Sequence, residues 1–237
     1  WPHFLIHVGG KMKLKRIKLR NFRCYKNETI VDIGDLTVLV GKNDSGKSAI
    51  FDALSIFFDE TKIDADDASK TGNPSDVRII CEFEGFPGSI IIDADYPTSL
   101  EQEFLLNREG LIEVHKIYDI TSGQKTIKPK IRANAYHPSV TSANDLLTLT
   151  NAKLKTRASE LGLDTSGINL TINTPIRQLI RESVPDLELA MQEIPLDKEG
   201  GKGIWDQLSK HIPIFALFKA DRPSTDQDAE AQDPLKL

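Results

Sequence analysis

Residues 41–48 read Gly-Lys-Asn-Asp-Ser-Gly-Lys-Ser, which completes the phosphate-binding pattern G-x-x-x-x-G-K-S/T. An apolar run at residues 36–40 precedes this loop, and an amphipathic stretch follows it from Lys47. The order predicts a strand buried on both faces, then a glycine-rich turn whose N–H groups surround an anion, then a helix whose N-terminus faces that anion. The flanking pattern argues against a glycine turn that binds nothing. We therefore expect a nucleoside triphosphate site.

The roles of individual loop residues follow from the chemistry of such loops. The Lys47 ammonium reaches the β- and γ-phosphates and is the candidate catalytic side chain, while the Ser48 hydroxyl coordinates Mg²⁺. The expected ligands are ATP and Mg²⁺. The residues expected to line the phosphates are Gly41, Lys42, Asn43, Asp44, Ser45, Gly46, Lys47 and Ser48.

Composition narrows the class of protein. A chain of 237 residues with 39% hydrophobic and 27% charged residues is long enough for one large globular domain or two small ones. No apolar run reaches the ~18 residues that a membrane helix needs, so we expect no membrane partner. Two cysteines, Cys24 and Cys81, predict reduced thiols in a cytoplasmic protein. Because the chain opens on Trp1, we expect residues 1–11 to be a tag or upstream non-native segment.

Charge is unevenly distributed. The net charge of −5 argues against a generally basic nucleic-acid coat. A local basic face remains open, and so does a solvated edge strand protected by its charges against mispairing. The cationic residues concerned are Lys11, Lys13, Lys15, Arg16, Lys18 and Arg20.

Periodicity divides the chain into elements. Strands are predicted at 12–20, 29–33 and 36–40, and a helix with one apolar face at 50–58. A surface loop at 59–75 is followed by alternating segments that predict an antiparallel meander over 76–135, with a short helix at 97–107. A helical region is expected at 140–211, with helices ending before Gly162 and starting at Thr174-Pro175. A last strand is predicted at 214–218, and residues 212–237 are expected to hold it and the start of an insertion.

Two segments resemble the start of the ABC-type ATPase heads of the SMC, RecF and OLD (overcoming lysogenization defect) proteins. The first is Asn21-Phe22-Arg23, which ends a charged strand, and the second is the Gly-x-Asn-x-x-Gly-Lys-Ser loop that begins at Gly41. SMC and RecF loops generally carry glycine after the asparagine, whereas Asp44 at that position is similar to OLD-like ATPases. The resemblance covers residues 12–58 well and 76–135 in pattern, and is thin from 136 onward, where 215–224 resembles the strand and turn before a helical insertion.

The resemblance implies an α/β fold, a P-loop NTPase of ABC-type head architecture. Its mixed sheet would carry an antiparallel β-meander subdomain and a helical subdomain. It also implies that ATP binding is coupled to formation of a homodimer and to engagement of DNA by the full-length protein.

Hydrolysis in such heads needs a carboxylate pair after a second buried strand and a Ser-Gly-Gly signature. Residues 89–95, Ser-Ile-Ile-Ile-Asp-Ala-Asp, are a candidate for the first, but the antiparallel-strand interpretation is favoured. No Ser-Gly-Gly occurs, and Gly200-Gly201 is expected to turn the chain. The resemblance places these elements, and the Toprim nuclease domain of OLD proteins, further downstream. We therefore expect a fragment that binds ATP–Mg²⁺ weakly and hydrolyses it very slowly.

Two further ligands are candidates. Gln227, after the last predicted strand, is the best-placed glutamine for a Mg²⁺-contacting Q-loop, but a solvated residue of an acidic loop is the favoured interpretation. Arg23 could approach the nucleotide from the first strand pair or serve a plain surface role. The histidines show no metal-ligand spacing.

Alternative functions remain open at this point. A RecF- or SMC-like DNA-repair ATPase would share the head and lack the nuclease. A small-substrate phosphotransferase would need a parallel βα succession after residue 58, which the alternating pattern argues against. A nucleotide-binding regulatory module without turnover is the third alternative.

Overall fold

Six antiparallel strands form the central sheet in the computed structural model, which describes residues 3–7, 12–42, 45–93, 96–123, 126–197 and 199–218. Every strand pairing within the described residues is antiparallel, so the predicted mixed sheet is wrong for this part of the chain. Across the sheet the strands lie in the order β3 (Thr29–Asp32), β2 (Lys13–Arg20), β4 (Val77–Glu84), β7 (Ile112–Tyr118), β8 (Lys130–Pro138) and β9 (Leu189–Pro195).

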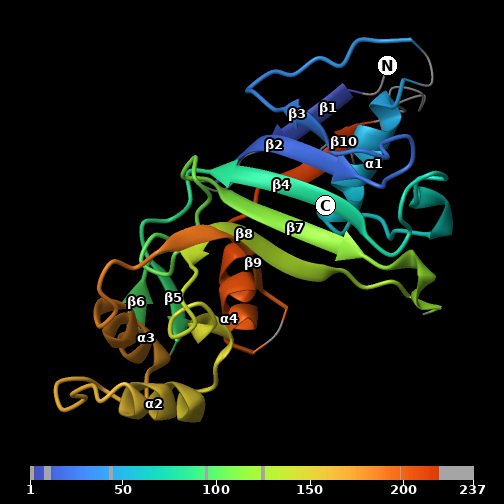
Figure 1. Cartoon of the computed structure of the whole chain (residues 1–237). Coiled ribbons are helices and arrows are strands. Elements are labelled where there is room, and N and C mark those ends of the chain that lie inside the picture. Colours follow the sequence, from blue (N-terminus) through green and yellow to red (C-terminus); the bar gives the residue numbers. More distant parts are fainter. Residues whose placement is uncertain are drawn as a thin grey trace.

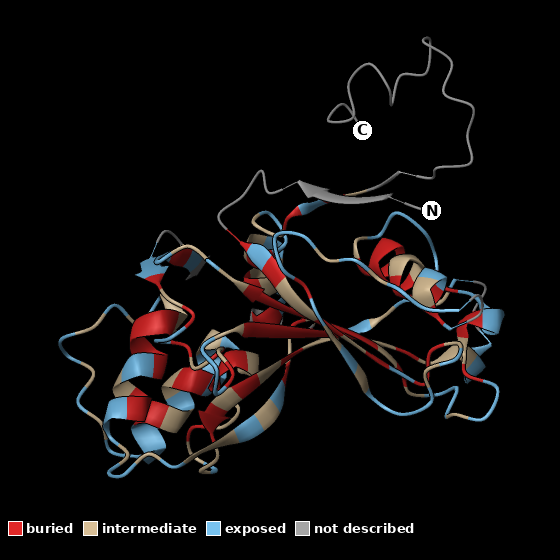
Figure 2. Ribbon diagram, turned by 90° about the horizontal axis from the view of Figure 1, so that it is seen from above, coloured by how far each residue is buried: buried red, intermediate tan, exposed pale blue. Residues whose placement is uncertain are grey.

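The sheet separates an apolar face from a charged one. In β4, Val77, Ile79, Cys81 and Phe83 are fully buried in the main core, and the intervening residues point to the opposite face. Helix α1 (Lys47–Phe57) packs into the same core through the face that its spacing predicts. Figure 2 shows the buried residues running along the strands and on one side of the helices.

The segment before the phosphate loop differs from its prediction. Residues 36–40 form no strand, and Leu36, Val38 and Val40 are 86%, 71% and 82% exposed. Leu39, which alternates with them, packs against the main core. An apolar run predicts burial only when a neighbouring strand covers it, and within the described residues none pairs with this segment.

Two strand pairs lie outside the central sheet. Strand β1 (His3–His7) pairs antiparallel with β10 (Ile214–Phe218), so part of the segment expected to stand outside the fold takes part in strand pairing. Strand β5 (Ile90–Asp93) pairs with β6 (Tyr96–Thr98) in a hairpin between β4 and β7.

A second core lies at the other end of the sheet from α1 (Figure 1). Helices α2 (Asn151–Glu160) and α3 (Asn173–Glu182) pack together there, and Gly162 ends the first of them with a φ of +66°. This core is made of the buried residues Ala143, Leu146, Leu154, Ala158, Ile176 and Ile180.

Three predictions for residues 97–211 are wrong. The expected helical region also contains β9, the edge strand of the central sheet. Residues 97–107 form β6 and a series of turns in place of a helix. Gly200 and Gly201 lie in the first turn of α4 (Glu199–Leu208), where a Cβ at Gly201 would clash with the Pro195 carbonyl oxygen. A close backbone approach, which only glycine permits, explains the glycine at position 201.

Candidate nucleotide-binding site

Gly46 sits at the point where the phosphate loop becomes helix α1. Its φ of +90° is a left-handed conformation that side chains rarely adopt. A Cβ at this position would lie 2.7 Å from Tyr25 Oη and 2.8 Å from Cys24 Sγ. The second glycine of the motif is therefore required both by the backbone conformation and by the turn that packs against it.

Lys47 places its ammonium inside the loop. Its Nζ donates to the carbonyl oxygens of Gly41 at 2.8 Å and Lys42 at 2.6 Å, and to Ser45 Oγ at 3.2 Å. Asn43 and Asp44 lie outside the described residues. The structure thus brings the two ends of the motif together around the predicted phosphate-contacting cation.

The N-terminus of α1 is suited to an anion. The first intrahelical bond runs from Ile50 N to Gly46 O, and the N–H groups of the residues before Ile50 have no partner within the helix. The first turn contains no acidic residue, and no side chain among the described residues caps the helix. Ser48 is exposed in this turn, as a metal-coordinating hydroxyl must be.

The turn at residues 21–25 contacts the start of α1 through Tyr25 and Arg23. Tyr25 Oη donates to Gly46 O at 3.1 Å, and Arg23 Nε donates to Asp67 Oδ1 at 2.8 Å. Arg23 also forms an ion pair with Asp52 of α1. Partial burial would lower the pKa of Arg23, but the two carboxylates outweigh it and raise the pKa above its ordinary value.

Asn21, the first residue of Asn21-Phe22-Arg23, has a structural role in the turn. Its φ is +55°, its Nδ2 donates to Asp76 O at 2.8 Å, and its Oδ1 accepts from Asn73 N at 3.0 Å. The asparagine therefore turns the chain and ties it to the segment that leads into β4. Arg23, a candidate nucleotide ligand in the sequence, is bonded to Asp67 and to Asp52 of α1.

These residues fit ATP and Mg²⁺ in part. Gly46, Lys47 and the free end of α1 provide cation and N–H donors for phosphate oxygens, and Ser48 provides one oxygen ligand for a metal. Within the described residues, no group of three or more His, Cys, Asp or Glu side chains could hold a metal ion. Mg²⁺ would therefore take its remaining ligands from phosphate oxygens and water, as it commonly does.

The other candidate ligands are less well defined. The strand in residues 89–95 is β5, whose antiparallel pairing with β6 agrees with the favoured interpretation, and Asp95 lies outside the described residues. Gln227 also lies outside them. Both cysteines are free thiols; Cys24 is exposed, and burial raises the pKa of Cys81 well above its ordinary value.

The basic stretch of β2 forms ion pairs across the sheet. Lys18 Nζ lies 2.6 Å from Glu82 Oε1, and Arg16 Nη1 lies 2.7 Å from Glu82 Oε2. Lys13, Lys15 and Arg20 pair with Asp35, Glu84 and Asp76. β2 lies between β3 and β4, so it is not an edge strand. Among the described residues, neither the basic face nor the solvated edge strand is found.

The sequence of residues 12–237 matches the family of the AAA ATPase domain. The chain belongs to this family. Membership supports ATP binding and ATPase function, with nucleotide and Mg²⁺ as the ligands that such a domain uses, and the site at Gly41–Ser48 agrees with it.

A curated relative adds a shorter match. The uncharacterized protein MJECL44 of Methanocaldococcus jannaschii is 43% identical over 56 residues, which is 24% of this chain. The chain covers 17% of the length of that relative. In this AAA ATPase domain, no helix of the described residues is long and apolar enough to cross a membrane.

Proposed function

We propose that this AAA ATPase domain is the ATP-binding portion of an ABC-type head similar to those of OLD-like nucleases. The observation that carries the proposal is the Lys47 ammonium, held in the loop by Gly41 O and Lys42 O beside the uncapped N-terminus of α1. The arrangement places a cation next to the N–H groups at the start of the helix. A phosphate group is the ligand whose charge and oxygen atoms match them.

Different residues of the loop and of α1 would contact the triphosphate and its Mg²⁺. Lys47 would exchange its carbonyl partners for phosphate oxygens, and the N–H groups of the first turn of α1 would donate to the same group. Ser48 would hold Mg²⁺, which neutralises phosphate charge. Tyr25 would hold the end of the loop through its bond to Gly46 O, and Arg23 would hold α1 through its ion pair with Asp52.

The order of elements supports a head of the ABC type over a phosphotransferase. The antiparallel pair β2–β3 precedes the loop, and every described strand after α1 pairs antiparallel, without a parallel βα succession. The exposed aliphatic side chains of Leu36, Val38 and Val40 also support a head that is completed by further strands. We further propose that the complete protein forms a homodimer and engages DNA when ATP binds.

ATP binding can be tested directly. We expect a fluorescent ATP analogue with Mg²⁺ to bind the purified chain weakly, and Lys47→Ala to reduce the affinity at least tenfold, because one charge-assisted phosphate contact contributes about 1.5–3 kcal/mol. Ser48→Ala should remove the Mg²⁺ dependence of binding. Lys62→Ala, which removes an exposed lysine after α1, is the matched control and should bind as the unmodified chain does. Equal affinity of the Lys47→Ala and Lys62→Ala chains would contradict the proposal.

Turnover and the nuclease need separate experiments. We expect very slow hydrolysis of ATP by this chain, and rapid turnover abolished by Lys47→Ala would show that the hydrolytic groups are already present. A RecF- or SMC-like ATPase is the second candidate, since the same loop and turn would serve it. Cleavage of plasmid DNA by the full-length protein would favour the OLD-like assignment, and DNA-stimulated ATPase without cleavage would favour the second candidate.

A further inference from the structure

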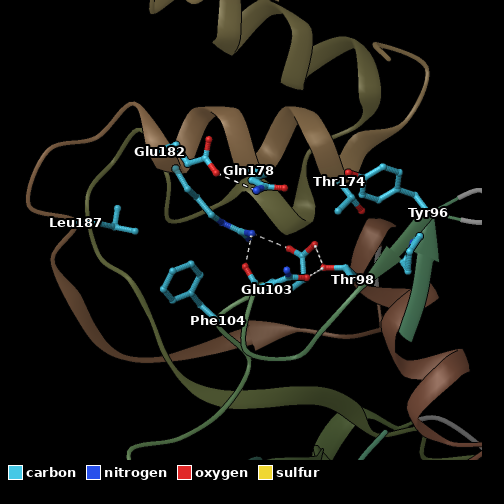
Figure 3. Close-up of a pocket in the computed structure, with 11 residues that line it drawn as sticks. Tyr96, Thr98, Glu103, Phe104, Thr174, Gln178, Glu182 and Leu187 are labelled. Carbon is cyan, nitrogen blue, oxygen red and sulfur yellow. Dashed lines mark hydrogen bonds and ion pairs between the residues drawn. The ribbon is translucent and has the colours of Figure 1, made fainter. Parts of the chain in front are cut away.

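A cavity of about 310 Å³ lies at the end of the molecule that holds α2 and α3, away from the phosphate loop. Its walls come from α3, from β6 and from the turn that follows β6. Figure 3 shows Gln178 and Glu182 on the helix and Glu103 and Phe104 on the turn below it. A volume of this size is at the lower end of small-molecule sites.

A buried cluster of three charges borders the cavity. Glu103 Oε1 accepts from Arg177 Nη2 at 2.8 Å, and Glu103 Oε2 accepts from Arg181 Nη1 at 2.8 Å. The side chains of Glu103, Arg177 and Arg181 are 1%, 2% and 6% exposed. Both guanidinium groups therefore donate to the one carboxylate of Glu103, and all three side chains are buried.

Arg181 keeps one edge of its guanidinium unused. Nη1 is satisfied by Gln102 O at 3.0 Å and by Glu103, and the flat face lies 5.4 Å from the centroid of the Phe104 ring. Nε and Nη2 are buried and have no hydrogen-bond partner. These two atoms form the edge from which arginine donates two parallel bonds to a carboxylate or phosphate. Burial of donors without partners is unfavourable, so a group that fills this edge stabilises the fold.

The rest of the cavity narrows the choice of anion. Pro97, Phe104 and Leu187 line it with apolar surface. Glu182, which accepts from Gln178 Nε2 at 2.9 Å, adds a negative charge at the exposed rim. Its repulsion disfavours a multiply charged phosphate over a single carboxylate.

We propose that this cavity binds a small organic acid, whose carboxylate pairs with the Nε–Nη2 edge of Arg181 and whose apolar body packs against Phe104 and Leu187. The site lies at the opposite end of the sheet from the phosphate loop. It is therefore a second ligand site, independent of the nucleotide.

Benzoate is a suitable probe, because it joins one carboxylate to a flat apolar ring. We expect benzoate at millimolar concentration to shift the NMR resonances of residues 96–104 and of α3 in the full chain. Benzamide, its neutral isostere, and inorganic phosphate should leave them unchanged. Arg181→Lys keeps the charge and removes the two-donor edge, so the affinity for benzoate should fall at least tenfold. Arg157→Lys, the same change at the arginine that pairs with Asp145 on the neighbouring helix α2, should alter it less than twofold.

A second pair of variants avoids the buried cluster altogether. Gln178 is exposed on α3 at the rim of the cavity. Gln178→Glu should weaken benzoate binding and Gln178→Lys should strengthen it, whether or not Arg181→Lys folds. Absence of benzoate shifts in the unmodified chain would overturn the proposal and leave water as the occupant. Binding of phosphate in preference to benzoate would overturn the carboxylate assignment.

Discussion

The two ends of the central sheet hold positive charge in opposite ways. At the phosphate loop, Lys47 is partly exposed and its ammonium is bonded to backbone carbonyls and to Ser45 Oγ. At the cavity, Arg177 and Arg181 are buried and share the carboxylate of Glu103. The first arrangement leaves the cation available to a ligand and takes little part in folding. The second makes the cation part of the core.

The variant with the largest expected effect on stability tests whether the buried charges contribute to folding. Glu103→Gln keeps the shape of the side chain but removes the negative charge that pairs with two buried guanidinium groups, which should lower the free energy of unfolding by about 3–5 kcal/mol. Burial alone would raise the pKa of Glu103, yet the two arginines hold it below its ordinary value, so the group is a carboxylate at neutral pH.

Lys47→Ala is the matched comparison at the loop. Because its contacts are exposed, we expect a change within about 0.5 kcal/mol. Urea denaturation followed by circular dichroism would measure both variants. Equal destabilisation by the two would contradict the division of the molecule into a ligand-binding end and a folding end.

Acidification should weaken the cavity end through His137. This side chain is fully buried, and its Nδ1 donates to Phe104 O at 2.8 Å. Burial lowers the pKa of His137 to about 4, with Arg181 lowering it and Glu103 raising it. Because the unfolded chain titrates near the ordinary value of 6.5, it takes up the proton first as the pH falls. The free energy of unfolding therefore keeps its full value above about pH 6.5. It falls by about 3 kcal/mol as the pH is lowered towards 4.

His137→Asn isolates this effect, since the asparagine amide can still donate to Phe104 O and does not titrate. Free energies of unfolding of both chains between pH 7.5 and 4.5 would give the difference, because the carboxylates titrate alike in the two. Parallel pH profiles would show that His137 is protonated in the folded chain at the same pH as in the unfolded one.

The contrast also explains what could be predicted from the sequence. The phosphate loop and the helix after it are local patterns, so Gly46, Lys47 and the apolar face of α1 follow from spacing alone. The cavity joins Glu103 to residues of α3 more than seventy positions away, and no motif marks either partner. The prediction for residues 36–40 and that for the cations of β2 failed for the same reason. Whether residues 36–40 are buried, and whether the cations of β2 are paired with acidic residues, depends on which strand lies next to each segment.

Gly46→Ala is expected to have a smaller effect, at the loop itself. The Cβ would force a side chain into a left-handed conformation and against Tyr25 Oη and Cys24 Sγ, which should lower stability by about 1–3 kcal/mol and reduce ATP affinity. Gly34→Ala is the control, because its Cβ would meet no atom closer than the Leu36 carbonyl oxygen at 3.8 Å. Thermal unfolding and nucleotide titration would compare them. Full ATP affinity in the Gly46→Ala chain would show that the loop can bind phosphate without the bracing turn.

Tyr25→Phe is expected to have a smaller effect than Gly46→Ala, and it tests whether the turn at residues 21–25 holds the loop in place or only stabilises the fold. The variant removes one hydrogen bond, from Tyr25 Oη to Gly46 O, and leaves the ring packed on the core. We expect about 1 kcal/mol of lost stability and a weaker affinity for the ATP analogue, since the loop would lose a contact that fixes the start of α1. Tyr136→Phe, in β8 and distant from the loop, should leave nucleotide affinity unchanged. If both variants bind the nucleotide equally well, the turn at residues 21–25 stabilises the sheet alone, and the loop is organised by Lys47 and its carbonyl partners.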